Sequence, residues 1–383
     1  MTVPKLRFKE FDNDYLELKY DKFAPLQRGF DLPVSTIVEG DFPVVFSNGI
    51  LKKHNEFKAK APGVVTGRSG TIGNITWVEK DYWPHNTSLW VTNFFGNEPK
   101  YVFYFLQEFD VSRFASGSGV PTLNRNDVHA QLINIPDNKE EQTKIAAFLS
   151  TVDEKISQLN QKHQLLSQYK QGMMQKLFSQ QIRFKADDGS EFGDWDKKKL
   201  VELTSWSSGG TPSKDYGGYW NGDIPLISGA SMHTQKLFES DVTITELGLK
   251  KGSKLAPKDS ILILVRGSML FKKIPIGLTF KDVAFNQDVK CIQPNNNLDS
   301  AYLFQWLLAK EHTIQNKVTS TGIGAGKLDT ADLQNLEFLQ PTLEEQTKIA
   351  NFLSNIDQKI EVVAQQIEQA KTWKKGLLQQ MFV

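Results

Sequence analysis

The sequence predicts a mixed α/β protein with two globular α/β domains separated by two long helices. Three observations support this fold class: a segment that occurs twice, a long helical pattern after each copy, and strand-like apolar runs before each copy. The helices are expected to pack as an antiparallel coiled coil, and the whole chain is expected to form a pseudo-twofold internal repeat.

The repeat is the strongest signal in the chain. Residues 140–150 recur as residues 344–354 with one difference, Ala147 against Asn351. The register then continues without a gap through the rest of both helical patterns. A repeat of this length predicts two copies of one structural unit.

Each copy begins a helix. Asn138 and Thr342 are residue types that cap helix N-termini, and Glu141 and Glu345 stand three residues on, as a capping box requires. The apolar residues that follow keep a heptad spacing over about four heptads. They are Leu149, Val152, Ile156, Leu159, Leu166, Met173 and Leu177, then Leu353, Ile356, Ile360, Val363, Ile367, Ala370, Leu377 and Met381.

Such a seam needs a partner. The two helices could pair within the chain, or each could pair with a helix of a second chain, which would make the protein a dimer. The order globule, helix, globule, helix favours the internal pair. We expect domain bounds of 1–137 and 180–340 for the globules, and 138–179 and 341–383 for the helices.

Composition excludes several classes of protein. Lys and Arg total 45 against 44 Asp and Glu, so the charge alone does not indicate nucleic-acid binding. The single cysteine, Cys291, is expected to be buried, and the six histidines lack zinc-site spacing, so no metal is expected. No long apolar run or secretory leader is present, which favours a cytoplasmic protein with no membrane partner.

Sequence similarity between the two halves of the chain is unevenly distributed. The helix starts are nearly duplicated, whereas the globules have diverged. A protein that binds two copies of one partner needs two copies of one surface, and a protein that reads two different targets needs two different surfaces. We therefore expect two equivalent docking sites and two readers of different specificity.

A divergent globule followed by a helix that starts Glu-Glu-Gln-x-x-Ile-Ala, with the whole repeated, resembles the specificity subunits of type I restriction–modification systems. Residues 210–213 before 219–225, and the glycine loops 116–119 and 321–324, support the resemblance. It covers essentially the whole chain.

The resemblance implies that each globule is a target-recognition domain for one half of a bipartite, asymmetric DNA sequence. The helices would set the half-site spacing and dock two methyltransferase subunits, which methylate adenine N6 from S-adenosylmethionine. A restriction subunit would cleave DNA using ATP and Mg²⁺. This chain would be non-catalytic and would bind no cofactor itself.

Two loops at the ends of strand-like runs combine arginine, serine and glycine, which suits contacts to guanine or phosphate. A solvated arginine in a tight turn is the alternative. The DNA-binding candidates, including nearby lysines and polar loops, are Arg68, Ser69, Gly70, Thr71, Lys53, Arg113, Ser118, Arg266, Gly267, Ser268, Lys272, Lys273, Lys214 and Lys327.

The duplicated helix start supplies candidates for contact with the methyltransferase subunits. If these side chains do not face a partner, they belong to the fold. They are Glu141, Gln142, Ile145, Phe148, Glu345, Gln346, Ile349 and Phe352.

Two other functions compete with this interpretation. The first is a nuclease, because Asp259, Asp288 and Lys290 resemble a nuclease metal site, but the first globule has no counterpart. The second is a coiled-coil scaffold that does not bind DNA. A phosphate-binding loop at Lys327 is excluded because Leu328 replaces the required Ser or Thr.

Overall fold

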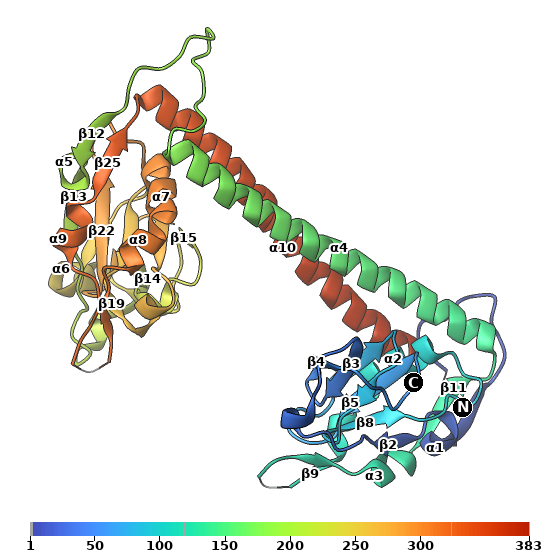
Figure 1. The fold of residues 1–383 in the computed structure, drawn as a ribbon. Helices are drawn as coiled ribbons and strands as arrows, with labels where there is room; N and C mark the ends of the chain where they lie inside the picture. Colours follow the sequence, from blue (N-terminus) through green and yellow to red (C-terminus); the bar gives the residue numbers. More distant parts are fainter. Residues whose placement is uncertain (1–2, 118, 323, 383) are drawn as a thin grey trace. The chain divides into compact units, whose positions relative to one another are not determined.

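The computed structural model describes residues 3–117, 119–322 and 324–382 (Figure 1). It divides into two compact units, which are Met1–Gln161 with Ala364–Val383 (unit 1) and Lys162–Val363 (unit 2). Each unit therefore holds one globule, a stretch of the long helix that follows it and a stretch of the other long helix.

Unit 1 contains a four-stranded and a three-stranded sheet and two short strand pairs. The four-stranded sheet has the order β2 (Leu26–Arg28), β8 (Ser88–Val91), β5 (Gly63–Gly67), β6 (Ile75–Val78), and the three-stranded sheet β4 (Gly49–His54), β3 (Phe42–Phe46), β7 (Trp83–Pro84). The pairs are β1 (Tyr15–Lys19) with β11 (Leu132–Pro136) and β9 (Ala115–Ser116) with β10 (Thr122–Leu123). The helices are α1 (Tyr20–Phe23), α2 (Pro99–Glu108), α3 (Arg125–His129) and the 3-10 turns η1 (Val34–Thr36) and η2 (Val111–Phe114).

Unit 2 repeats this plan with longer sheets. A five-stranded sheet has the order β13 (Thr204–Ser208), β22 (Val289–Pro294), β18 (Ile261–Leu264), β20 (Ile276–Thr279), β15 (Lys236–Leu237), and a four-stranded sheet β16 (Thr243–Ile244), β14 (Trp220–Ile227), β21 (Val283–Phe285), β17 (Lys254–Ala256). Smaller sheets join β12 (Asp196–Lys199) with β25 (Glu337–Gln340), and β19 (Arg266–Gly267), β24 (Gly326–Lys327) and β23 (Thr319–Ser320). The helices are α5 (Leu200–Leu203), α6 (Glu246–Gly252), α7 (Ser300–Ala309), α8 (Glu311–Gln315), α9 (Thr330–Gln334) and the turns η3 (Gly217–Tyr219), η4 (Gly229–Ser231) and η5 (Ser268–Phe271).

The core of each unit forms where sheet, helix and long helix meet. The central strands β5 and β18 are buried along their whole length, which explains the continuous apolar run of β18 and the absence of charged residues from β5. In unit 1 the core includes Ile145 and Leu149 from the helix start, and in unit 2 it includes Ile349 and Leu353. Cys291 is buried in β22, as predicted.

The long helices are α4 (Lys139–Phe178) and α10 (Leu343–Met381). They pack against each other within each unit, so the predicted internal pairing is confirmed. In unit 1, Lys374 Nζ lies 2.7 Å from Asp153 Oδ1, and in unit 2, Lys170 Nζ lies 2.7 Å from Asp357 Oδ1. Position 153 of α4 pairs with position 374 of α10, and position 170 pairs with position 357. The two helices therefore run antiparallel.

The two ion pairs occupy matching places in the repeat. In each, a third residue is hydrogen-bonded to the carboxylate. The hydroxyl of Tyr104 in α2 donates to Asp153 over 2.8 Å, and the amide of Gln305 at the same position of α7 donates to Asp357 over 2.8 Å. Each lysine is therefore held in an otherwise apolar seam by a carboxylate that is itself hydrogen-bonded. Polar groups of this kind fix the register of paired helices.

Only part of the predicted helix-start chemistry is present. The side chain of Asn138 accepts from Glu140 N over 2.8 Å, and Thr342 Oγ1 accepts from Glu345 N over 3.4 Å, so both caps are confirmed. The predicted capping boxes are wrong, because the carboxylates of Glu141 and Glu345 bind arginines instead. The heptad pattern is also modified at its ends, where the apolar positions pack into the globules.

Candidate nucleic-acid and partner interfaces

In unit 1, the predicted arginine loop and the predicted glycine loop lie side by side. Arg68 follows the buried strand β5, and its carbonyl oxygen accepts from Leu123 N over 2.8 Å. Ser69 forms a β-bridge with Thr122. Gly67 is needed for this tight turn, because a Cβ there would lie 1.7 Å from the carbonyl oxygen of Thr71.

Unit 2 joins the corresponding segments into a three-stranded sheet. Arg266 pairs with Lys327 and Gly267 with Gly326, and β24 pairs in turn with β23. Gly267 has φ +149°, which a side chain would oppose. The exposed side chains of Arg266 and Lys327 thus lie on adjacent strands of one small sheet. The sequence pattern alone predicts two separate loops at these positions.

The two arginine loops follow corresponding strands, but they are not equivalent residue for residue. Leu123 N donates to Arg68 O, whereas Leu328 N donates to Val265 O, over 2.9 Å. Val265 therefore occupies the place of Arg68, and Arg266 stands one residue further on. Arg266 therefore holds the repeat position of Ser69, which bridges to Thr122 as Arg266 pairs with Lys327.

The remaining DNA-binding candidates are distributed more widely. Gly70, Thr71 and Ser268 are exposed beside the arginine loops, and Lys272 and Lys273 are exposed directly after η5. The guanidinium of Arg113 lies over the rings of Phe109 and Phe114. Lys53 is exposed on β4 of the three-stranded sheet, and Lys214 is exposed in the loop between β13 and η3. Ser118 lies outside the described residues.

A cleft of about 550 Å³ lies beside the arginine loop of unit 1. Arg28, Arg68 and Arg125 line it, together with polar and apolar neighbours from β2, β8 and β10. His129 stands nearby and accepts a hydrogen bond from Leu26 N over 2.8 Å. Burial, and then the positive charge of Arg125, lowers the pKa of His129. Sequence reasoning missed Arg28 and Arg125, because neither lies in a motif.

The duplicated helix start is built around a buried carboxylate. Arg7 donates two hydrogen bonds to Glu141, over 2.7 and 2.8 Å, and Arg183 donates two to Glu345, over 3.0 and 2.8 Å. The Trp195 indole also donates to Glu345, over 2.9 Å. These bonds raise the pKa of Arg7 and of Arg183 and tie the start of each globule to its helix.

The neighbouring glutamines have the same role. Gln142 accepts from Glu98 N over 2.9 Å and donates to Pro136 O over 2.9 Å, and Gln346 accepts from Asp299 N over 2.8 Å. Six of the eight candidates for contact with a partner subunit are buried within this chain, where they join the globule to its helix. They are Glu141, Gln142, Ile145, Glu345, Gln346 and Ile349.

The two other members of the motif are only partly buried and stand in aromatic clusters. Phe148 contacts Phe8 and Trp373 edge-on, with ring centroids 5.9 and 6.1 Å apart. Phe352 contacts Phe184, with centroids 5.6 Å apart. Trp373 is 54% exposed, which is unusual for so large an apolar side chain.

Tyr169, the residue of α4 that corresponds to Trp373 in the repeat, is 51% exposed. Each unit thus carries an exposed aromatic residue at the same repeat position on the long helix that returns to it.

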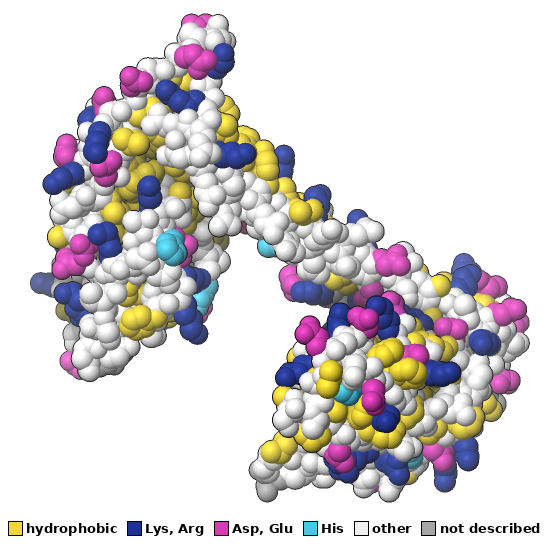
Figure 2. All heavy atoms as spheres, viewed as in Figure 1, with side chains coloured by type: hydrophobic (Ala, Val, Ile, Leu, Met, Phe, Trp, Pro, Cys, Tyr) yellow, Lys and Arg dark blue, Asp and Glu magenta, His cyan; other side chains and the backbone are white. Residues whose placement is uncertain are grey.

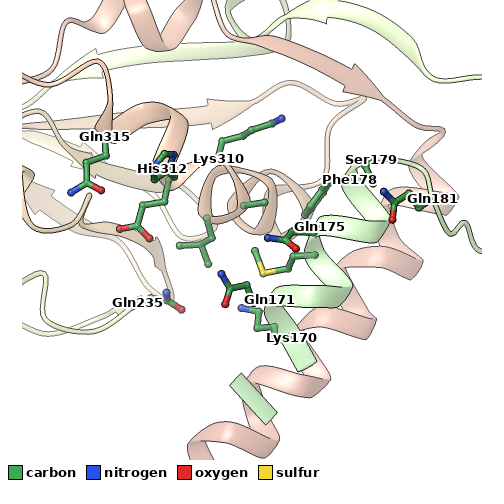
Figure 3. Close-up of a pocket in the computed structure, with 14 residues that line it drawn as sticks. Lys170, Gln171, Gln175, Phe178, Ser179, Gln181, Gln235, Lys310, His312 and Gln315 are labelled. Atoms are coloured by element: carbon green, nitrogen blue, oxygen red, sulfur yellow. The ribbon is translucent and has the colours of Figure 1, made fainter. Parts of the chain in front are cut away.

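A second cleft, of about 770 Å³, lies in unit 2 between α4 and α8. Figure 3 shows Lys170, Gln171 and Gln175 of α4 on one side and His312 and Gln315 of α8 on the other. Its lining is mainly neutral and amide-rich, which does not point to a charged ligand.

Other classes of site find little support in the part of the chain that the structure describes. There, no group of three or more histidine, cysteine, aspartate or glutamate side chains is placed to hold a metal ion. None of the described helices is long and apolar enough to cross a membrane. Figure 2 shows lysine and arginine side chains interspersed with acidic ones over the visible faces, in keeping with the balanced charge.

Comparison with known proteins gives consistent matches. Residues 33–168 and 193–372 match the family described as "Type I restriction modification DNA specificity domain". A specificity subunit of the Escherichia coli type I restriction enzyme EcoR124I/EcoR124II is 28% identical over 318 residues, which are 79% of this chain and 75% of that protein. The MjaVIII specificity subunit of Methanocaldococcus jannaschii is 27% identical, over 73% of this chain and 68% of its own.

Two solved structures share the fold. The S subunit of a type I restriction–modification system from M. genitalium has a TM-score of 0.66 and 16% identity, over 100% of this chain and 99% of its own. A chain from a structural study of complex assembly and conformational transition in a type I system has a TM-score of 0.60 and 15% identity, over 97% and 98% of the two chains.

Proposed function

Because this chain belongs to the family of type I restriction–modification DNA specificity domains, we propose that each of its two globules reads one half of a bipartite, asymmetric DNA target. The observation that carries the proposal is the pairing of an arginine loop with a glycine-rich hairpin in both units. In each unit, basic and small polar residues gather at the end of a buried strand, where a rigid sheet positions them.

The two readers are expected to differ in chemistry. Unit 2 presents the exposed side chains of Arg266 and Lys327 on adjacent strands, which suits hydrogen bonds to guanine O6 and N7 or to phosphate. Unit 1 has a half-buried Arg68 one residue earlier in the repeat and exposes Gly70 and Thr71. This difference supports an asymmetric target, in which the half-sites have different sequences.

We expect Arg266→Ala to weaken DNA binding through one half-site only. Removal of one bidentate hydrogen-bonding pair with a base corresponds to about 1–3 kcal/mol, or roughly 5- to 150-fold in affinity. The measurement is titration of the chain, in complex with its methyltransferase subunit, against duplexes in which either half-site is scrambled. Lys281→Ala is the control, because Lys281 is an exposed cation of the same unit outside the hairpin sheet.

Arg68→Ala should weaken the DNA binding contributed by unit 1 and leave the reading of the other half-site by unit 2 unchanged. Equal effects at both half-sites from either variant would contradict independent readers.

The long helices provide the spacing and the docking sites of the proposed complex. A 40-residue helix is about 60 Å long at 1.5 Å per residue, and readers on one face of DNA must stand about one helical turn or a multiple apart. The duplicated features support two methyltransferase subunits, one at each helix start. S-adenosylmethionine, ATP and Mg²⁺ would then be used by the methyltransferase and restriction subunits.

Trp373 in unit 1 and Tyr169 in unit 2 are the proposed docking residues for these subunits. Trp373 lies against Phe148 of the duplicated motif, and Tyr169 holds the same repeat position in unit 2. Exposed tryptophan and tyrosine are the residues that most often dominate binding energy. Trp373→Ala should weaken one of the two sites by at least about 2 kcal/mol, or roughly 30-fold, and leave the other intact.

Native mass spectrometry at limiting methyltransferase concentration measures how many methyltransferase subunits bind to each chain. Leu51→Ala is the matched control, because Leu51 is 59% exposed on β4 in the same unit. Two methyltransferase subunits bound to Trp373→Ala with unchanged affinity would remove Trp373 from the docking surface.

A further inference from the structure

Three arginines of unit 1 converge from distant parts of the sequence. Arg28 ends β2, Arg68 follows β5 and Arg125 begins α3, and all three line the cleft of about 550 Å³. Arg28 makes an ion pair of 2.9 Å with Asp31, which also contacts Asn86. Among the described residues, the guanidinium groups of Arg68 and Arg125 have no hydrogen-bond or ion-pair partner.

The three arginines of this cleft are not repeated in unit 2. The pairing of β2 with β8 corresponds to that of β13 with β22, which places Ser208 where Arg28 stands. The bond from Leu328 to Val265 places Val265 at the position of Arg68. Asp329 caps α9 as Asn124 caps α3, which places Thr330 at the position of Arg125.

All three arginines are thus replaced together by neutral residues in unit 2. Three guanidinium groups around one small opening repel one another, and a single carboxylate, Asp31, offsets only part of that charge. Such an arrangement is stabilised when an anion enters. We infer that this cleft of unit 1 binds a phosphodiester group of the DNA backbone.

This inference rests on the proposed DNA-binding function and specifies how one half-site is held. The cleft is concave, whereas the reading of base edges requires an element that projects into a groove. Guanidinium groups with several donors bind phosphate oxygens by paired hydrogen bonds. Contacts to phosphate fix the position of the protein on DNA and carry no sequence information. The cleft is therefore expected to fix the position of unit 1 on the DNA backbone.

The test measures salt dependence and sequence preference together. The triple variant Arg28→Gln, Arg68→Gln, Arg125→Gln should bind DNA at least about tenfold more weakly. The slope of log affinity against log salt should fall in magnitude by about 0.9 for each phosphate that the variant no longer neutralises. The recognised motif should be unchanged, because the weakening applies equally to all sequences.

Two further variants separate phosphate binding from other causes. The triple lysine variant, Arg28→Lys, Arg68→Lys, Arg125→Lys, should keep most of the salt slope, since phosphate accepts either cation. Asp31→Asn should tighten binding by removing the negative charge at the cleft, an increase in affinity that misfolding could not produce. Lys281→Gln, which removes an exposed cation of unit 2, is the control and should leave the slope unchanged.

Three results would overturn the inference. Unchanged affinity and slope in the glutamine variant would show that the cleft does not contact DNA. A relaxed motif at one half-site would show that the arginines read bases instead of phosphate. Failure of the unmodified complex to bind any DNA would overturn the proposed function as well. This result is seen without any substitution, so it can be told apart from a failure of the inference about the cleft alone.

Discussion

Glu345→Ala should destabilise unit 2 by about 3 kcal/mol, the largest effect expected from any single substitution at a helix start. The Glu345 side chain is fully buried and accepts two hydrogen bonds from Arg183 and one from Trp195. Breaking a buried pair typically costs about 3–5 kcal/mol, because it leaves the other charge without a partner. We expect the lower end of that range, since the Arg183 side chain is 20% exposed and can be hydrated.

The adjacent residue provides a matched control. Glu344 is exposed and lies 3.7 Å from Lys348, so Glu344→Ala should change stability by less than about 1 kcal/mol. Thermal unfolding measures both, and about 3 kcal/mol corresponds to a fall of roughly 6–12 °C for a unit of this size. Similar behaviour of the two variants would mean that the buried carboxylate does not hold the globule to its helix.

Lys170→Glu should disrupt the pairing of α4 with α10 in unit 2, at a cost of about 3 kcal/mol. The substitution places a second carboxylate against Asp357 in a mostly buried seam, where like charges repel strongly. Adding Asp357→Lys should restore most of the stability. The Gln305 side-chain oxygen, which is buried and has no partner among the described residues, can then accept a hydrogen bond from the new lysine.

A double-mutant cycle measures this interaction directly. We expect a coupling energy of about 2–3 kcal/mol between positions 170 and 357 from chemical denaturation. The same cycle at Lys374 and Asp153 should give a comparable value, because these residues form the equivalent pair in unit 1. Additive effects at either pair would show that the lysines are not register-setting.

The α/β globules, the two long helices and their internal pairing are predictable from the sequence. Those predictions depend on local patterns, such as the heptad spacing that leads to Leu149 and Leu353 in the two cores. The role of the duplicated Glu-Glu-Gln segment could not be predicted in the same way. A repeated surface and a repeated internal joint leave the same sequence pattern, and only the bonds from Arg7 and Arg183 distinguish them.

The DNA-binding candidates show a similar limit. The local sequence pattern is enough to find the loops of Arg68 and Arg266. The one-residue offset between these arginines in the repeat is set by main-chain hydrogen bonds to β10 and to the segment after β24. Arg28 and Arg125 carry no local signal, because their relation to Arg68 arises from strand pairing and from the turn that starts α3. Long-range contacts of this kind are set by the fold as a whole.

The most direct test of the central claim is the mapping of adenine methylation in cells that contain the methyltransferase subunit, with and without this chain. We expect N6-methyladenine at one split, asymmetric motif that appears only when the chain is present, together with a stable complex of the chain and the methyltransferase. A methylation pattern that does not change when the chain is removed, with no complex formed, would contradict the specificity role and leave a coiled-coil scaffold as the better description.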